Sequence, residues 1–254
     1  VEYQDKQSYA IDVGYPVMGD EQLERLERAF SGTPGTGEIQ VLIWTTTPWT
    51  IPSSQAISVG ADLTYALVQY QRDGQPCRLI CARSLLDSVM QRLAIEDYQT
   101  LSECPGTALE QLVVQHPFYR RDIPLLLGEH VTDDAGTGCV HTAPDHGMED
   151  FLVANQYGIG TLNYILDNGL FRGEVELFAG EHVYKVDPQV ISVLNEQGRL
   201  MACSQFTHSY AHCWRTKTPL IYRATPQWFI SMRENGLLEK ALEAVDSVDW
   251  HPDW

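Results

Sequence analysis

Apolar residues in this chain occur in short runs and in helical repeats, and the two spacings predict its secondary structure. Runs bounded by turn residues predict strands at residues 9–13, 40–44, 66–70, 77–82, 111–116, 125–128 and 138–142. Apolar residues three and four positions apart predict helices at residues 20–30, 84–93, 148–157, 187–197 and 226–245. Pro188 suits the first turn of the fourth helix, and Gly198 suits its end. Short strands with helices between them predict an α+β fold, with a barrel-like mixed β core and peripheral helices.

The predicted elements divide the chain into three regions. Residues 1–37 contain an extended segment, a helix and a linker at 31–37, residues 38–206 form a compact core, and residues 207–254 form an arm. With 254 residues, 44% of them hydrophobic, the chain can bury one large core. No run approaches the roughly 18 apolar residues of a membrane helix, and no signal peptide opens the chain. We therefore expect a cytoplasmic protein.

Two segments about ninety residues apart each join apolar residues to a turn rich in hydroxyl groups or glycines. Residues 44–50 read Trp-Thr-Thr-Thr-Pro-Trp-Thr, and residues 136–144 read Gly-Thr-Gly-Cys-Val-His-Thr-Ala-Pro. Turns at strand ends surround small ligands with backbone N–H groups and short polar side chains. Either segment alone is also consistent with ordinary turn chemistry. Together they indicate a polar pocket.

These two segments resemble the editing (connective-peptide) domain inserted in class I isoleucyl-, valyl- and leucyl-tRNA synthetases. The resemblance continues through residues 145–151 and 210–229, so it covers nearly the whole chain. Residues 45–50 resemble the isoleucine branch, because the valine and leucine branches resemble Thr-Thr-Arg-Pro followed by an acid. The His-x-Gly-His and Lys-Met-Ser-Lys-Ser strings of a synthetic site do not occur in the sequence. We therefore expect a fragment that cannot make aminoacyl-adenylate.

The resemblance implies post-transfer editing, the hydrolysis of the aminoacyl ester of mischarged Val-tRNA(Ile), with hydrolysis of valyl-adenylate left open. The implied partners are the 3′ acceptor end of tRNA(Ile) and the rest of the synthetase, with no membrane and a monomeric state. No cofactor is expected in this fragment, since ATP and Mg²⁺ would serve the full-length enzyme. The alternative is a non-catalytic module that binds the tRNA acceptor end or docks on the synthetase.

Asp150, Thr46 and Thr47 are the expected catalytic residues. Acids favour the first turn of a helix in any protein, but the resemblance implies that Asp150 anchors the α-ammonium of the mischarged amino acid. Hydroxyls both donate and accept hydrogen bonds, so Thr45, Thr46 and Thr47 can contact the ester, the ribose or a water. Strand alternation implies that not all three face the pocket. By resemblance Thr47 lies near the substrate side chain, and Trp49 forms a wall or stacks.

The remaining expected substrate contacts come from the second segment and from Ser54. The backbone amides of Gly136, Thr137 and Gly138 are candidate oxyanion donors. His141 matches the family histidine that bounds the side-chain pocket, although a lone histidine can also be structural. Ser54 stands where isoleucine enzymes often have Asn, so its role is open.

We expect no metal and no covalent intermediate. Some relatives hold zinc in the arm through Cys-x-x-Cys pairs, whereas here Thr216 replaces the second cysteine after Cys213. The sequence also contains no Gly-x-Ser-x-Gly string and no recognisable Cys/His or Ser/His/Asp arrangement. Direct attack by water is the expected chemistry.

The charge of the chain is unfavourable for binding tRNA. There are 17 basic and 34 acidic residues, for a net charge of −17. Affinity for nucleic acid depends largely on neutralising phosphates, so we expect this chain alone to bind tRNA weakly. Two basic clusters, Arg120 with Arg121 and Arg215 with Lys217, are candidate contacts or simply solvated surface charges.

Overall fold

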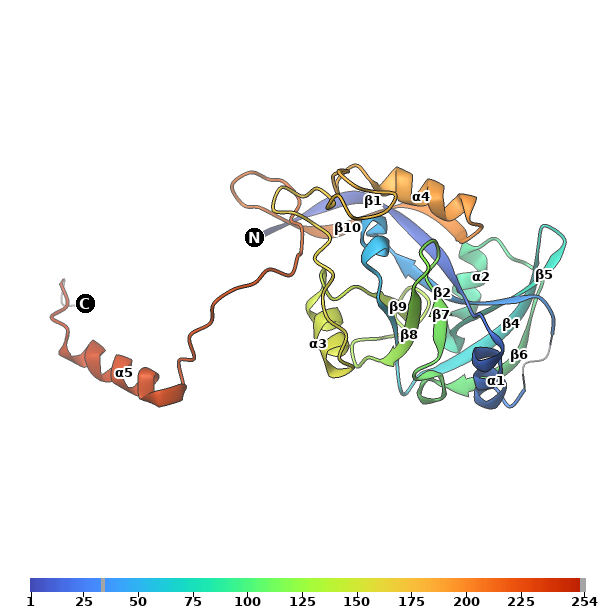
Figure 1. Cartoon of the computed structure of the whole chain (residues 1–254), viewed down its shortest axis with the longest axis horizontal. Helices are drawn as coiled ribbons and strands as arrows, with labels where there is room; N and C mark the ends of the chain where they lie inside the picture. Colours follow the sequence, from blue (N-terminus) through green and yellow to red (C-terminus); the bar gives the residue numbers. More distant parts are fainter. Residues whose placement is uncertain (33–34, 252–254) are drawn as a thin grey trace. The chain divides into compact units, whose positions relative to one another are not determined.

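The computed structural model describes residues 1–32 and 35–251, in two compact units, Val1–Ala224 and Thr225–Trp254 (Figure 1). The strands are β1 (Glu2–Pro16), β2 (Glu38–Thr45), β3 (Ala56–Val59), β4 (Thr64–Arg72), β5 (Gln75–Ala82), β6 (Tyr98–Pro105), β7 (Val113–Gln115), β8 (Asp122–Leu127), β9 (Cys139–Thr142) and β10 (Leu200–His212). The α-helices are α1 (Asp20–Ala29), α2 (Leu86–Arg92), α3 (Met148–Gln156), α4 (Asp187–Glu196) and α5 (Leu237–Ser247). The described residues also form four 3₁₀ turns, η1 (Pro48–Ser53), η2 (Arg83–Leu85), η3 (Gly106–Leu109) and η4 (Glu234–Gly236). The predicted α+β class is confirmed.

The larger sheet has six strands in the order β10-β1-β2-β5-β4-β6. β1 pairs antiparallel with both β10 and β2, and Ile11 lies opposite Thr45 at the end of β2. The second half of β1 is buried without alternation, as expected for a strand covered on both faces. Figure 1 shows β1 and β10 running together as a long ribbon, and α4 packs against β10 and η1.

The smaller sheet has four strands in the order β7-β8-β3-β9. β3 runs parallel to β8 and antiparallel to β9, with Ile57 opposite His141. The barrel-like expectation needs a correction, because the described strands form two separate sheets rather than one closed barrel. One large apolar core spans both sheets; its fully buried members include Ile11, Leu42, Ile57, Leu67 and Phe178.

The last predicted helix begins eleven residues later than expected, at Leu237 instead of residue 226. Asn235 and Gly236 both have positive φ, at 57° and 70°, and this left-handed pair interrupts the helical run. β10 continues across the expected boundary at 206/207, so the division into core and arm stays a prediction. The expected linker at 31–37 includes residues 33–34, which lie outside the described residues. Within the described chain, no helix is both long and apolar enough to cross a membrane.

Candidate functional site

The threonine turn, which we define as residues 45–50, lies between the end of β2 and the start of η1. Pro48 occupies the first position of η1, where its missing N–H costs nothing. The Thr45 hydroxyl accepts the Thr47 N–H at 3.1 Å and lies 3.1 Å from the Thr47 hydroxyl. The Thr50 hydroxyl donates to the Thr47 carbonyl at 2.9 Å and lies 3.3 Å from the Thr47 hydroxyl. These bonds hold the turn in one conformation.

The threonine turn is joined to β9 by a hydrogen bond between Thr50 Oγ1 and His141 Nε2, 2.9 Å long. A hydroxyl has one hydrogen, and that of Thr50 is used on the Thr47 carbonyl. His141 Nε2 therefore donates to Thr50, and the other ring nitrogen, Nδ1, carries no hydrogen while the imidazole is neutral. His141 Nδ1 is buried and has no partner among the described residues.

His141 is held neutral by its surroundings. Burial, and to a smaller extent the neighbouring His146, lower the pKa of His141 to about 4. The imidazole is therefore uncharged near neutral pH. A neutral ring fixed by Thr50 is a rigid surface suited to contact with an apolar side chain.

Asp150 lies in the first turn of α3, beside the C-terminal end of β9. Its carboxylate Oδ2 accepts the Ala143 N–H at 2.8 Å, two residues beyond His141. Burial raises the pKa of Asp150, the Ala143 hydrogen bond lowers it and the Glu149 charge raises it, and the net result is a pKa of about 6. A carboxylate in such a position is stabilised by any cation that reaches it.

Trp49 is almost fully buried and is fixed from two sides. Its backbone N–H donates to Asp187 Oδ1 at 3.0 Å, which ties the threonine turn to the first turn of α4. Its ring meets the His146 ring edge-on, with centroids 4.8 Å apart. His146 Nε2 in turn lies 3.1 Å from Ser53 Oγ. The indole therefore has a defined orientation.

The structure separates the roles expected for the other hydroxyl groups. Thr45 is buried and its hydroxyl holds the turn, whereas Thr46 is half-buried and its hydroxyl has no hydrogen-bond partner in the described part of the chain. Ser54 is fully buried, and its hydroxyl accepts a hydrogen bond from Tyr15 at 3.2 Å. Ser54 thus contacts the core.

The turn formed by Gly136, Thr137 and Gly138 lies at the opposite end of β9 from Asp150. Gly138 and Ala143 are five positions apart along mostly extended chain, about 16 Å at the usual strand rise. The α-ammonium and carbonyl of one amino acid are only two bonds apart. One amino acid therefore cannot place its ammonium on Asp150 and its oxyanion at this turn, and the oxyanion role of Gly136, Thr137 and Gly138 stays a prediction.

The described contacts give this glycine turn a structural role. The Thr137 carbonyl accepts the Ala82 N–H at 2.8 Å, and the Gly138 carbonyl accepts the Tyr65 hydroxyl at 2.6 Å. Gly138 has a φ of +71°, and a Cβ there would lie 2.3 Å from the Ala82 Cβ, so only glycine fits.

Sequence reasoning missed three residues of the site, Thr50, His146 and Asp187. Thr50 belongs to the first motif segment and His146 lies two residues after the second, but their partners His141 and Trp49 are about ninety residues away in sequence. Asp187 resembled an ordinary helix start. Among the described residues, no group of three or more His, Cys, Asp or Glu side chains is placed to hold a metal ion.

Three comparisons relate this geometry to known proteins. A family model described as "Leucyl-tRNA synthetase, editing domain" matches residues 34–177. Isoleucine–tRNA ligases of Hahella chejuensis and Teredinibacter turnerae are 58% and 57% identical to the whole chain, which spans about a quarter of their length (27% and 26%).

Solved structures share the fold at low sequence identity. The chain titled GlLeuRS-CP1 matches with a TM-score of 0.60 at 15% identity, covering 79% of this chain and 100% of that one. The editing domain of the P. knowlesi cytosolic leucyl-tRNA synthetase matches with a TM-score of 0.56 at 13% identity, covering 80% and 97%.

Proposed function

Because this chain belongs to the leucyl-tRNA synthetase editing-domain family, we propose that it hydrolyses the aminoacyl ester of mischarged tRNA, with Val-tRNA(Ile) as substrate. The relatives that match the whole chain are isoleucine–tRNA ligases, and this supports the choice of tRNA. The observation that carries the proposal is the placement of the Asp150 carboxylate at the end of β9, beside a neutral His141 that is bonded to the threonine turn.

Asp150 would bind the α-ammonium of the valyl group. A desolvated carboxylate pairs with an ammonium through a charge-assisted hydrogen bond, about twice as strong as a neutral one. The Ala143 N–H fixes one carboxylate oxygen and thereby orients the other. Capture of the ammonium would place the ester near the threonine turn.

The neutral His141 ring and Thr47 would exclude isoleucine. One methylene supports only about 1–3 kcal/mol of discrimination in a synthetic site, a limit for which isoleucyl-tRNA synthetases are the standard example, and hydrolytic double-sieve editing is the remedy. A second site that accepts the smaller side chain needs a rigid boundary. The Thr50 hydrogen bond gives His141 that rigidity.

Hydrolysis would proceed by direct attack of water on the ester carbonyl carbon. The bond from this carbon to the ribose oxygen breaks, the ribose oxygen takes a proton, and valine and uncharged tRNA leave. The Thr46 hydroxyl, unpartnered among the described residues, can orient the water or stabilise the oxyanion. We propose that water is the only co-reactant, and that Gly136–Gly138 support the site without contacting the ester.

The proposed partners are the tRNA(Ile) acceptor end and the remainder of the synthetase, and we propose a cytoplasmic monomer. ATP and Mg²⁺ belong to amino-acid activation in the whole enzyme and take no part in this hydrolysis.

We expect kcat/KM for deacylation to fall about tenfold between pH 7 and pH 5, with a midpoint near pH 6. Only the ionised Asp150 carboxylate pairs with the ammonium, and with a pKa of about 6 roughly a tenth of it is ionised at pH 5. Burial also raises the pKa of Asp187 to about 6, so Asp187→Asn is the control and should keep the same midpoint. Rates are corrected for spontaneous ester hydrolysis; a flat profile would contradict the role of Asp150.

We expect His141→Ala to raise the ratio of isoleucyl to valyl deacylation about fourfold. Removing the ring makes room for the extra methylene, whose burial contributes roughly 0.8 kcal/mol. His251→Ala removes an exposed histidine of the second unit and should leave the ratio unchanged. If the ratio in His141→Ala stays at or below the wild-type value, the exclusion role passes to Thr47 and Trp49.

A further inference from the structure

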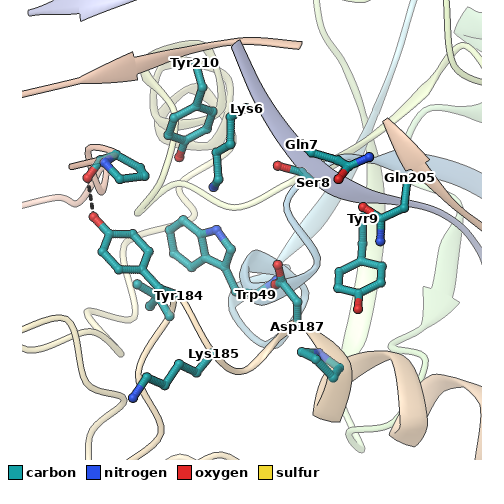
Figure 2. A pocket seen from close by; sticks show the side chains of 13 residues that line it. Lys6, Gln7, Ser8, Tyr9, Trp49, Tyr184, Lys185, Asp187, Gln205 and Tyr210 are labelled. Atoms are coloured by element: carbon teal, nitrogen blue, oxygen red, sulfur yellow. Dashed lines mark hydrogen bonds between the residues drawn. The ribbon is translucent and has the colours of Figure 1, made fainter. Parts of the chain in front are cut away.

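A cleft of about 560 Å³ adjoins the outer side of the threonine turn (Figure 2). Residues of the β1–β10 ribbon line one side, and Trp49 with the segment 183–188 lines the other. Its volume falls within the range of about 300–1,000 Å³ that is usual for small-ligand sites. None of its residues except Trp49 was assigned a role above in binding the ester.

Aromatic rings dominate this cleft. Figure 2 shows the rings of Trp49, Tyr184 and Tyr210 around one space, with Tyr9 farther along it. Trp49 is held by Asp187 and His146 and is only 5% exposed, so its indole forms the bottom of the cleft, whereas Tyr184 is 45% exposed and presents its ring. Aromatic faces of this kind stack on nucleobases without preference for sequence.

Lys6 brings a positive charge into the cleft. Its ammonium lies 4.4 Å from the centroid of the Tyr210 ring, and in Figure 2 both side chains extend toward Trp49. Within the described residues, no carboxylate lies within 4.0 Å of this ammonium and no hydrogen bond satisfies it. The chain has a net charge of −17, but this lysine places a positive charge in the cleft, and that charge can bind a phosphate.

Asp187 supplies a hydrogen-bond acceptor at the same place. Its Oδ1 accepts the Trp49 N–H, and its Oδ2 has no donor among the described residues. Carboxylates accept hydrogen bonds from exocyclic amino groups of bases, such as N4 of cytosine, and cannot pair with the O4 carbonyl of uracil. The acceptor therefore favours a base that carries an amino group.

We propose that this cleft is a subsite for a cytidine of single-stranded RNA, whose base carries an exocyclic amino group at N4. The base stacks on Tyr184 and reaches the edge of Trp49 at the bottom of the cleft, Asp187 Oδ2 accepts its amino group, and Lys6 contacts its phosphate. The inference rests on the proposed function, because the CCA sequence at the 3′ end of tRNA supplies such nucleotides. The cleft would hold the strand while the terminal ester reaches the threonine turn.

The first test uses the 254-residue chain and the uncharged RNA tetranucleotide ACCA, labelled at its 5′ end, with binding followed by fluorescence anisotropy. Lys6→Met should weaken binding about fivefold and reduce the slope of log affinity against log salt by about 0.7, the value for one phosphate contact on a single strand. Lys240→Met makes the same charge change in α5 and should alter neither quantity by as much. Equal effects of the two variants, or no binding of ACCA by the wild type at low salt, would overturn the proposal.

The second test concerns the base. The wild type should bind ACCA more tightly than AUUA, in which both cytidine amino groups are replaced by carbonyls. Asp187→Asn can keep an oxygen on the Trp49 N–H while presenting an N–H to the base, so the preference should vanish or reverse. A preference that persists in Asp187→Asn would overturn the assignment of Asp187, and so would equal binding of both oligonucleotides by the wild type.

A third variant, Tyr184→Leu, tests stacking and should weaken ACCA binding at least about fivefold, whereas Tyr98→Leu, outside the cleft, should not. Thermal unfolding by circular dichroism checks that each variant is folded. The tetranucleotide carries no ester, so loss of binding in these variants is measured separately from hydrolysis. A chain that hydrolyses Val-tRNA(Ile) but shows none of these effects would refute the subsite and leave the proposed function intact.

Discussion

Replacing Asp150 with Asn should lower single-turnover deacylation of Val-tRNA(Ile) by roughly 10- to 150-fold. Asn keeps the shape and can still accept the Ala143 N–H, but it carries no charge for the ammonium. The lost charge-assisted hydrogen bond corresponds to about 1.5–3 kcal/mol, and misalignment of the ester adds to the loss. The measurement is the rate with enzyme in excess over charged tRNA.

Glu149→Gln is the matched control, because it makes the same charge change one residue away on an exposed side chain and should keep the wild-type rate. Wild-type rates in Asp150→Asn would refute this residue as the ammonium anchor.

The substitution Asp150→Asn should also stabilise the fold at pH 7. The pKa of Asp150 is raised in the folded chain above its ordinary value of 3.8, so the native state binds this proton more tightly than the unfolded state. The stabilisation that this proton provides is complete below about pH 4 and is lost as pH rises through about 6. Asn is neutral at every pH, and we expect about 1–3 kcal/mol of added stability at pH 7 that shrinks toward pH 4. Stability bought at the expense of activity would mark Asp150 as a functional residue.

Arg92→Met should lower the free energy of unfolding by about 3–5 kcal/mol. The Arg92 guanidinium donates to both oxygens of Asp12, at 2.8 and 2.7 Å, and Asp12 is only 1% exposed. Burial raises the pKa of Asp12, and the hydrogen bonds from Arg92 oppose that rise. Removing one partner leaves a buried, unpaired carboxylate. It also removes the 3.1 Å bond from Arg92 to the Gly136 carbonyl.

Urea denaturation measures this loss. Arg83→Met breaks the exposed Arg83–Glu103 pair and should cost less than about 1 kcal/mol. The double substitution Asp12→Asn with Arg92→Met should recover much of the stability, because no charge then remains buried. Equal losses in Arg92→Met and Arg83→Met would show that the buried pair does not stabilise this sheet.

Hydrophobic periodicity predicted four helices to within a few residues, because each presents apolar side chains to one core at helical spacing. It did not predict β3, which is only four residues long, nor the longer strands β6 and β10. Much of the outer part of β10 is exposed, and β6 is an edge strand with many polar residues, so neither has an apolar run. Such strands are specified by the neighbour they pair with, β4 for one and β1 for the other, and that pairing is absent from a local pattern.

The site, like the fold, was predictable in its local segments and not in the contacts between them. The two motif segments and Asp150 were recognisable from sequence, but their arrangement was not. His141 meets the threonine turn because β9 pairs with β3 in a register that places His141 opposite Ile57, and η1 precedes β3 directly. The bonds from Thr50 to His141 and from Trp49 to Asp187 join residues 91 and 138 positions apart, and no local spacing predicts them. The length of β9 likewise separates the glycine turn from Asp150.

The central claim, that this chain hydrolyses a mischarged ester, is tested most directly by incubating the 254-residue chain in excess with Val-tRNA(Ile) and Ile-tRNA(Ile) and measuring released amino acid. Filter binding at the same concentrations establishes that the tRNA is bound, which matters for a chain with a net charge of −17. The account predicts release of valine well above the spontaneous rate, with isoleucine release close to that rate. Bound Val-tRNA(Ile) that is hydrolysed only at the spontaneous rate would contradict the account and indicate a docking module.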